Sequence, residues 1–411
     1  MRVLFTTNPG LGHLHPMVPI AEQLTLAGHE VAFACAASFC PKVEALGFRA
    51  FPAGLDWLES QAERFFPALD GVVLERHPAW FLKHVFADTA ALRMVPDLVE
   101  RCRVWLPDLL VRNDWELGAC IASEILDIPH ATISVELFLP ARWWRAYAGE
   151  KLAGVRAAFG LDPYPAHDEF HQNLYLSFVP PSFQFPEYAL PPEVQSLRPL
   201  IFDRTEERGV PAWIDDLPAL PTVYATLGTV FNHRPDVFQS IVEGLRDEPI
   251  NLIVTLGSDE DPERFGPQPR NVHIERYIPQ SLLLPRCDAA ITHAGHGTTL
   301  AVLMHGLPSL AIPVSATDPY RALRCVATGA GLALNAPGHF YTGALRFPEV
   351  SPRSVRDRVR ELLDNPEYRA NSLRLREEAM ALPGPERAVE LLMGLASRRE
   401  GAAANCANLA N

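Results

Sequence analysis

The fold of this 411-residue chain is decided by residues 291–301, which read ITHAGHGTTLA. The apolar run that ends at Thr292 predicts a buried strand, the small residues after it predict a turn, and the letters that follow begin a helical pattern. Because Gly295 and Gly297 have no Cβ, backbone N–H groups at the helix start can approach an anion, which the helix dipole also favours. His293 stands at the carboxyl end of the strand, where open α/β sheets bind ligands. The stretch therefore indicates either a phosphate-binding turn or an ordinary turn with a capping histidine.

Composition is typical of a large globular enzyme. Hydrophobic residues make up 48% of the chain, and its length predicts two to three domains at roughly 150 residues each. The formal net charge of −13, without any basic run, disfavours a nucleic-acid or anionic-membrane surface. Seven cysteines without paired zinc spacing indicate reduced thiols in a cytoplasmic protein. No apolar run reaches the length of a membrane span.

Strand-like runs alternate with helical patterns along most of the chain, which predicts parallel sheets covered by helices. The expected strands are 2–7, 30–34, 109–112, 131–135, 222–226, 251–255, 273–276, 289–292 and 309–313. We predict an α/β protein with two Rossmann-like domains that face each other across a cleft. The expected segments are an N-terminal domain at 1–203, a charged linker at 204–220, a C-terminal domain at 221–384, a terminal helix at 385–400 and a disordered tail at 401–411.

Two stretches, 57–94 and 138–178, interrupt this alternation and are rich in aromatic residues. Long insertions in α/β domains often line substrate pockets, whereas packing between small helices would account for the same side chains. If the insertions line a pocket, a bulky apolar substrate would contact Phe65, Phe66, Trp80 and Trp143.

The first strand is followed by NPGLGHLHP at residues 8–16, which is the first turn of a Rossmann-like unit. A dinucleotide fingerprint would have a third glycine where His15 stands and an acidic residue after the second strand, so the nicotinamide or flavin interpretation is weak. His13 either caps the helix or acts as a general base at the mouth of the sheet. A carboxylate would orient it, and the candidates that follow the strand at 109–112 are Asp114 and Glu116.

In their order and spacing these motifs resemble the GT-B nucleotide-sugar glycosyltransferases, particularly the actinobacterial branch that glycosylates natural products, and the resemblance covers nearly the whole chain. GHLHP at 12–16 is similar to the turn whose histidine deprotonates the acceptor, and 226–232 resembles the opening segment of the donor domain. ERYIPQ at 275–280 resembles the base-stacking segment, and 293–298 matches the diphosphate loop. The donor-binding residues that the resemblance implies are Gly228, Thr229, Val230, Tyr277, Ile278, Gln280, His293, Gly295, Gly297, Thr298, Thr317 and Asp318.

Departures from the family pattern fall where the donor is recognised. Ala301 replaces the glutamate that often bonds the ribose, and Thr317 and Asp318 align with the usual Asp-Gln pair that bonds sugar hydroxyls. Arg321 aligns with the usual asparagine. These residues offer fewer hydrogen-bond partners for sugar hydroxyls. A deoxysugar, which has fewer hydroxyls, carried by thymidine or uridine diphosphate would therefore fit the site.

The resemblance implies an inverting transfer, without a metal or cofactor, to a hydrophobic aglycone such as a polyketide, macrolide or enediyne. His13 would take the acceptor proton. Asn113 stands where related sequences often have an acid, so either Asp114 has taken over that role or the dyad is incomplete, and we favour Asp114.

Two other functions stay open at this point. A nucleotide-sugar epimerase could use the same fold, and a helper subunit could bind nucleotide sugars after losing activity. The sequence also leaves open whether the protein is a homodimer.

Overall fold

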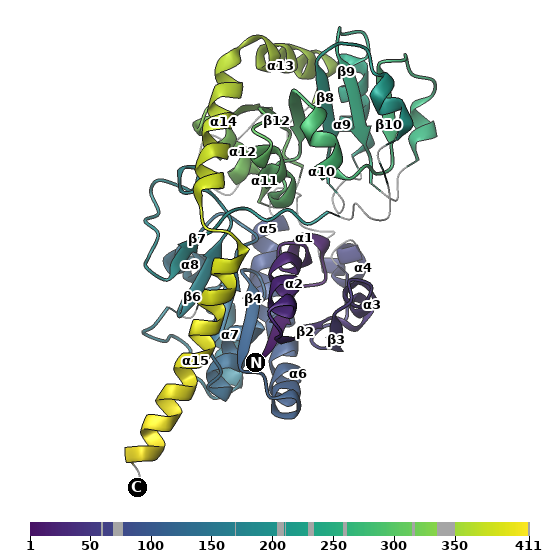
Figure 1. Cartoon of the computed structure of the whole chain (residues 1–411). Coiled ribbons are helices and arrows are strands. Elements are labelled where there is room, and N and C mark those ends of the chain that lie inside the picture. The colour runs from purple at the N-terminus through teal and green to yellow at the C-terminus, as the bar shows by residue number, and fades with distance from the viewer. Residues whose placement is uncertain are drawn as a thin grey trace.

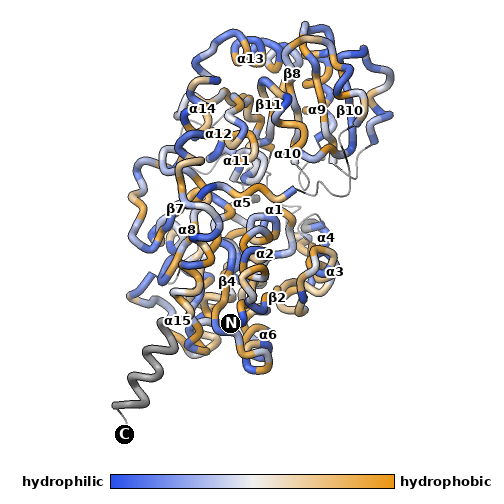
Figure 2. Tube along the Cα trace, viewed as in Figure 1, coloured by the Kyte–Doolittle hydropathy of each residue, from blue (hydrophilic) through white to orange (hydrophobic). Residues whose placement is uncertain are grey.

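The computed structural model describes residues 1–58, 61–68, 77–168, 170–203, 209, 211–228, 234–257, 261–314, 317–334 and 350–409. They form two α/β domains, each built around a parallel sheet and placed one above the other in Figure 1. This confirms the predicted fold class. Figure 2 shows hydrophobic residues along the central strands and hydrophilic residues on the outer loops.

The N-terminal sheet has the order β3-β2-β1-β4-β5-β6-β7. Its strands are β1 (Arg2–Thr6), β2 (Glu30–Cys35), β3 (Arg49–Pro52), β4 (Leu109–Asn113), β5 (His130–Ile133), β6 (Leu174–Ser177) and β7 (Val194–Ser196). Helices cover both faces, so the central strands β1 and β4 are buried almost throughout and read as continuous apolar runs. The strands β3, β6 and β7 were not predicted, because strands of three or four residues carry a weak periodic pattern.

The helices of this domain are α1 (Leu11–Leu14), α2 (Val18–Leu26), η1 (Ala37–Phe39), α3 (Cys40–Glu44), α4 (Ala62–Phe65), α5 (His77–Trp80), η5 (Phe81–Ala90), α6 (Ala91–Trp105), α7 (Gly118–Leu126), α8 (Ala141–Ala158) and η6 (Pro181–Phe183). The segments η5 and α6 follow α5 directly, and η5 packs on α8. Helices therefore make up much of the described part of the two aromatic-rich stretches, and their side chains pack with Trp115, Leu117 and Ile121 in one hydrophobic cluster.

The C-terminal sheet has the order β10-β9-β8-β11-β12-β13. Its strands are β8 (Thr222–Thr226), β9 (Asn251–Thr255), β10 (Val272–Glu275), β11 (Ala289–Thr292), β12 (Ser309–Ala311) and β13 (Gly331–Ala333). Around them lie η7 (Ala212–Asp216), α9 (Pro235–Leu245), η8 (Pro262–Phe265), α10 (Gln280–Leu283), η9 (Leu284–Arg286), α11 (His296–Met304), α12 (Asp318–Ala327), α13 (Pro352–Asp364) and α14 (Pro366–Ala381). The sequence predicted every strand here except β13.

Two boundaries differ from the sequence prediction. Within the predicted linker, η7 places Ile214 in the apolar core of the C-terminal domain, so that part of the segment is packed. The last helix, α15 (Pro385–Leu409), remains helical through most of the segment expected to be a disordered tail. Alanine-rich sequence follows residue 400, and alanine has the highest helix propensity.

The C-terminal helix of the chain packs against the N-terminal domain. Figure 1 shows α14 alongside the C-terminal domain and α15 alongside the N-terminal one. Residues Ala388, Leu392 and Leu395 of α15 lie in the same core as α2 and β4. Within the described residues, no helix combines the length and the apolarity that crossing a membrane requires.

The carboxyl edges of the two sheets face each other. The segment after β5 contacts the start of α12, the helix that follows β12. Thr317 and Arg321 at this helix start donate hydrogen bonds to the Glu136 carboxylate. On the same side, the ring of Phe185 lies edge-on to Tyr320 with centroids 6.2 Å apart. Figure 1 accordingly shows α1 and α11 at the facing ends of the two domains. Ligand-binding edges of open sheets are thus brought together.

Candidate active site

The first histidine turn follows β1 directly. His13 lies in α1, which begins after Gly10, and its backbone N–H donates to the Gly10 carbonyl. The side chain is buried, and its imidazole meets the ring of Phe86 with centroids 6.0 Å apart. The predicted histidine is therefore at the carboxyl edge of the first sheet, against an aromatic wall.

A cavity lies beside this turn. Its lining includes Asn8, Trp57, Phe86, Met94 and Glu116. The sequence analysis did not select Trp57 or Phe86 for acceptor contact. Trp57 follows β3, a strand that the pattern did not reveal.

None of the four aromatic residues predicted to contact the acceptor lines this cavity. Phe65 is exposed, whereas Phe66 meets the ring of Trp57 with centroids 5.3 Å apart. Trp80 packs against Phe66. Trp143 is buried in the hydrophobic cluster of the aromatic insertions. Packing between helices therefore accounts for most of these rings.

The turn after β4 is held by a buried arginine. Arg112 donates to the backbone carbonyls of Asn113, Asp114, Glu116 and Phe170. A guanidinium can satisfy several carbonyls at once because its donors form a planar fork. The turn is consequently fixed in shape.

Asn113 and Asp114 leave this turn in different directions. The Asn113 amide donates to Thr7 Oγ1 at 3.2 Å, next to the first histidine turn. Asp114 instead accepts from the backbone N–H of Val135 at 2.8 Å and from the Tyr175 hydroxyl. Burial raises the pKa of Asp114 to about 6. These contacts direct the Asp114 carboxylate toward β5 and β6.

The hydrogen bonds of Glu116 give it a structural role. Its carboxylate accepts from Thr6 Oγ1 at 2.6 Å and from the backbone N–H groups of Gly118 and Ala119 at the start of α7. Burial raises the pKa of Glu116. The side chain therefore links β1 to the helix that follows β4.

The second histidine turn follows β11, and two glycines enclose its imidazole. A Cβ at position 228 would lie 2.6 Å from Cε1 of His293, and a Cβ at position 295 would lie 2.1 Å from its Nε2. Gly228 also has a φ of +82°, which disfavours other residues. The imidazole thus rests against the backbone of both Gly228 and Gly295. Burial lowers the pKa of His293, so the neutral ring is favoured.

The two glycines of the loop differ in what they accommodate. The sequence analysis assigned both to the approach of an anion, but Gly295 makes room for His293. Gly297 has nothing within 4 Å of its ideal Cβ position among the described atoms, and it is exposed. Gly297 is therefore the one of the two that has open space beside its Cα.

The start of α11 offers backbone donors. Its N-cap is Gly295, which provides no side-chain cap, and the first backbone bond of the helix runs from Thr299 N–H to the Gly295 carbonyl. The N–H groups of residues 296–298 precede that bond and point out of the helix end. Thr298 is partly exposed beside them. This geometry suits an anion.

The residues aligned with the sugar-binding positions bond to one another. Thr317 and Arg321 both contact Glu136 of the other domain, and Arg321 also contacts Asp318 at 3.1 Å. All four side chains are buried. The sequence analysis did not single out Glu136, since an acid after a strand gives no sign of which domain it will meet.

The residues predicted to bind near the nucleotide base differ in burial and in hydrogen bonding. Tyr277 is 38% exposed, and its hydroxyl donates to Asp203. Ile278 is buried in the core, and Gln280 donates to the buried Tyr224 hydroxyl. Thr229 and Val230 lie outside the described residues. Among the residues that are described, no group of three or more His, Cys, Asp or Glu side chains could hold a metal ion.

Known proteins match the chain in both domains. The erythromycin biosynthesis protein CIII-like N-terminal domain matches residues 22–158, and the corresponding C-terminal domain matches residues 244–395. The 4'-demethylrebeccamycin synthase of Lentzea aerocolonigenes is 29% identical over 96% of this chain and 99% of its own length. The L-demethylnoviosyl transferase of Streptomyces niveus is 33% identical over 81% of this chain and 85% of its own.

Solved structures share the arrangement of both domains. The glycosyltransferase VinC in complex with DTDP has a TM-score of 0.76 at 26% identity, and the match covers 97% of this chain and 100% of that one. The calicheamicin glycosyltransferase CalG4 has a TM-score of 0.77 at 20% identity. These proteins therefore share the two-domain fold of this chain.

Proposed function

The chain belongs to the erythromycin biosynthesis protein CIII-like family and is a glycosyltransferase, and we propose that it moves a deoxysugar from thymidine or uridine diphosphate to a hydrophobic natural product. The resemblance drawn from the motifs is thereby confirmed at the level of the family. The observation that carries the finer proposal is the second histidine turn, where uncapped N–H groups and Gly297 leave room for a diphosphate.

The leaving group would be stabilised without a metal or cofactor. Negative charge builds on the β-phosphate as the bond to the sugar breaks, and preorganised N–H donors at the start of α11 stabilise such charge most. A neutral His293 would donate one ring N–H to a phosphate oxygen. Its Nδ1 is buried and has no hydrogen-bond partner among the described residues, which leaves it available for such a bond.

The acceptor would be activated at the first histidine turn. His13 would take the proton from the acceptor hydroxyl as its oxygen attacks the anomeric carbon from the face opposite the diphosphate, which inverts that centre. The ring of Phe86 beside His13 would offer an apolar surface to a hydrophobic acceptor. Because the two sheet edges face each other, the acceptor oxygen and the anomeric carbon could approach to the separation of about 3–3.5 Å that the reaction requires.

The role of Asp114 is revised in this proposal. Its carboxylate bonds Val135 and Tyr175, which supports the segment after β5. Asn113 is the residue of that turn that bonds Thr7 beside the histidine turn. Asp114 would therefore stabilise the fold and would not be the partner of the catalytic base.

Two measurements test the proposal. Calorimetry with thymidine diphosphate and uridine diphosphate should show binding of at least one of them. Mass spectrometry of the protein mixed with a TDP-deoxysugar and a panel of polyketide, macrolide and enediyne acceptors should detect a glycoside. An isomerised donor would favour the epimerase, and binding without any product across the panel would favour the helper subunit.

A further inference from the structure

Arg321 connects three separate segments of the molecule. Its guanidinium contacts Glu136 in the N-terminal domain, Asp318 in its own helix at 3.1 Å, and the backbone carbonyl of Ala294 at 2.5 Å from Nε. The arginine is buried, with 3% of its surface exposed. Burial of a guanidinium is unfavourable unless carboxylates and hydrogen bonds compensate for lost water, and here both are present.

The carbonyl that Arg321 holds belongs to a strained residue of the second histidine turn. Ala294 has a φ of +65°, in the left-handed region that residues with a Cβ rarely adopt. It stands between His293 and Gly295, which means that its conformation sets how the imidazole and the first amide of α11 are placed. Such strain persists only where neighbouring contacts maintain it. Arg321 supplies one of these contacts.

Glu136 brings the other domain into this arrangement. Its carboxylate accepts from the Thr317 hydroxyl and from Arg321, so it holds two residues at the start of α12. The segment that carries Glu136 is itself anchored, because Asp114 bonds the backbone of Val135. These contacts exist only when the two domains are together.

Attraction between Arg321 and a bound diphosphate is not the main effect of this residue. Two carboxylates flank the guanidinium, and therefore its positive charge is already compensated before any anion binds. What remains specific to arginine is its shape, with donors that serve Glu136, Asp318 and the Ala294 carbonyl at the same time.

We propose that Arg321 is a positioning residue for the diphosphate-binding turn, and that Glu136 makes this positioning depend on contact between the domains. Domain contact then strengthens the hold on the nucleoside diphosphate, and bound nucleoside diphosphate favours the closed form to the same extent. The inference rests on the proposed function, since it takes the second histidine turn as the diphosphate site.

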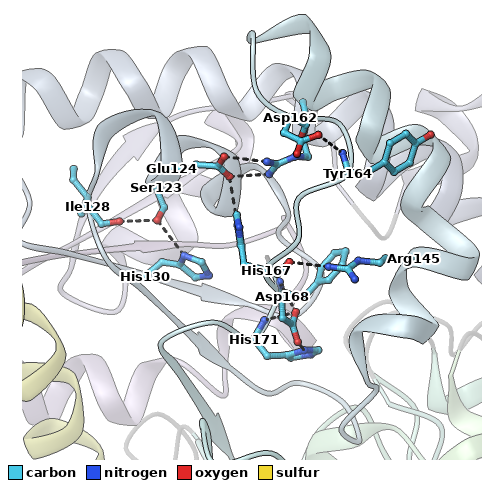
Figure 3. Close-up of polar contacts among 12 residues, drawn as sticks. Ser123, Glu124, Ile128, His130, Arg145, Asp162, Tyr164, His167, Asp168 and His171 are labelled. Carbon is cyan, nitrogen blue, oxygen red and sulfur yellow. Dashed lines mark hydrogen bonds and ion pairs between the residues drawn. The ribbon is translucent and has the colours of Figure 1, made fainter.

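A second buried arginine provides a matched control. Arg156 in α8 donates twice to Glu124 in α7, at 2.9 and 3.0 Å, and its Nε donates to the Asp162 carbonyl. Figure 3 shows Glu124 and Asp162 on either side of these bonds, with His167 also near Glu124. This pair has the same chemistry as the Arg321 cluster but lies within one domain.

The experiment compares affinities for thymidine diphosphate by calorimetry in intact variants. Arg321→Lys keeps the positive charge but removes the planar guanidinium that donates to three partners at once, and it should weaken binding by about tenfold. Glu136→Gln should weaken it by about fivefold, and the double variant should be no weaker than Arg321→Lys alone. Glu124→Gln should bind as the wild type does. Hydrogen exchange without ligand should be faster at residues 293–298 in both Arg321→Lys and Glu136→Gln, and should be as in the wild type in Glu124→Gln.

A milder change covers the case in which these variants fold poorly. Thr317→Val removes the hydroxyl that bonds Glu136 while leaving Arg321 in place, and it should weaken binding in the same direction by a smaller factor. Wild-type affinity in Arg321→Lys and Thr317→Val would overturn the inference and leave the proposed function intact. An equal loss in Glu124→Gln would also overturn it, because general destabilisation would then explain the effect. A wild type that binds neither thymidine nor uridine diphosphate would overturn the proposed function itself, and this inference with it.

Discussion

The two histidine turns look alike in sequence but are fixed by different means. Each follows a central strand of a parallel sheet and opens a helix. The imidazole of His13 is bordered by a side chain, Phe86, whereas that of His293 lies against the backbone at Gly228 and Gly295. Side chains can move to accept a different neighbour, but a backbone wall cannot. We therefore expect the first turn to be adaptable, which would suit the proposed acceptor site, and the second to be rigid, which would suit the proposed diphosphate site.

The largest expected effect is on the first turn. His13→Ala should lower transfer by about 10²–10⁴-fold, because a positioned base contributes that much. The affinity for thymidine diphosphate should stay within about twofold, because the donor half is untouched. Steady-state rates with calorimetry on the same preparation measure both. Near wild-type turnover would remove His13 from the mechanism.

The next effect tests the rigidity of the second turn. Gly295→Ala places a Cβ 2.1 Å from Nε2 of His293, so the imidazole or the loop must shift. Overpacking of this kind typically costs about 1–3 kcal/mol, and we expect thymidine diphosphate to bind at least about tenfold more weakly. Unchanged affinity in calorimetry would contradict the enclosed position of the ring.

A smaller effect separates a supporting role of Asp114 from a catalytic one. Its pKa is raised from 3.8 to about 6 by burial, so the folded state holds this proton more tightly than the unfolded state. The stability that protonation provides is present below about pH 4 and is lost as the pH rises to about 6. Two pKa units correspond to at most about 3 kcal/mol.

Asp114→Asn should remove this pH dependence. The melting temperature of the variant relative to the wild type should therefore rise between pH 4 and pH 6, and then stay level. Parallel curves for the two proteins would show that the carboxyl does not titrate in this range. A loss of transfer near 10⁴-fold would instead restore Asp114 as the partner of the base.

The smallest effect provides the matched control for the second turn. Gly12 lies in α1 beside His13, and an added Cβ would meet nothing within 4 Å. Gly12→Ala should leave nucleotide affinity unchanged and raise stability by at most about 1 kcal/mol, since alanine loses less chain entropy in a helix. A melting-temperature decrease of several degrees would show that the first turn is as closely packed as the second.

Much of the fold followed from local pattern. The strands that carry the site, β1, β4, β8 and β11, are buried on both faces, and therefore they are apolar runs that end at recognisable turns. The strands β3, β6, β7 and β13 were missed because three or four residues carry little periodicity. The aromatic insertions were located, but their pattern could not distinguish a pocket wall from helix packing.

The sequence by itself determined the two turns, because strand, glycine and histidine are neighbours along the chain and local backbone chemistry places them. Only the tertiary structure decided which neighbours those turns meet. Gly228 encloses His293, and Glu136 reaches Arg321, across separations in the chain that no local pattern spans. Asp114 turned away from the first histidine for the same reason, since a backbone N–H on the adjacent strand connection offered its carboxylate a partner.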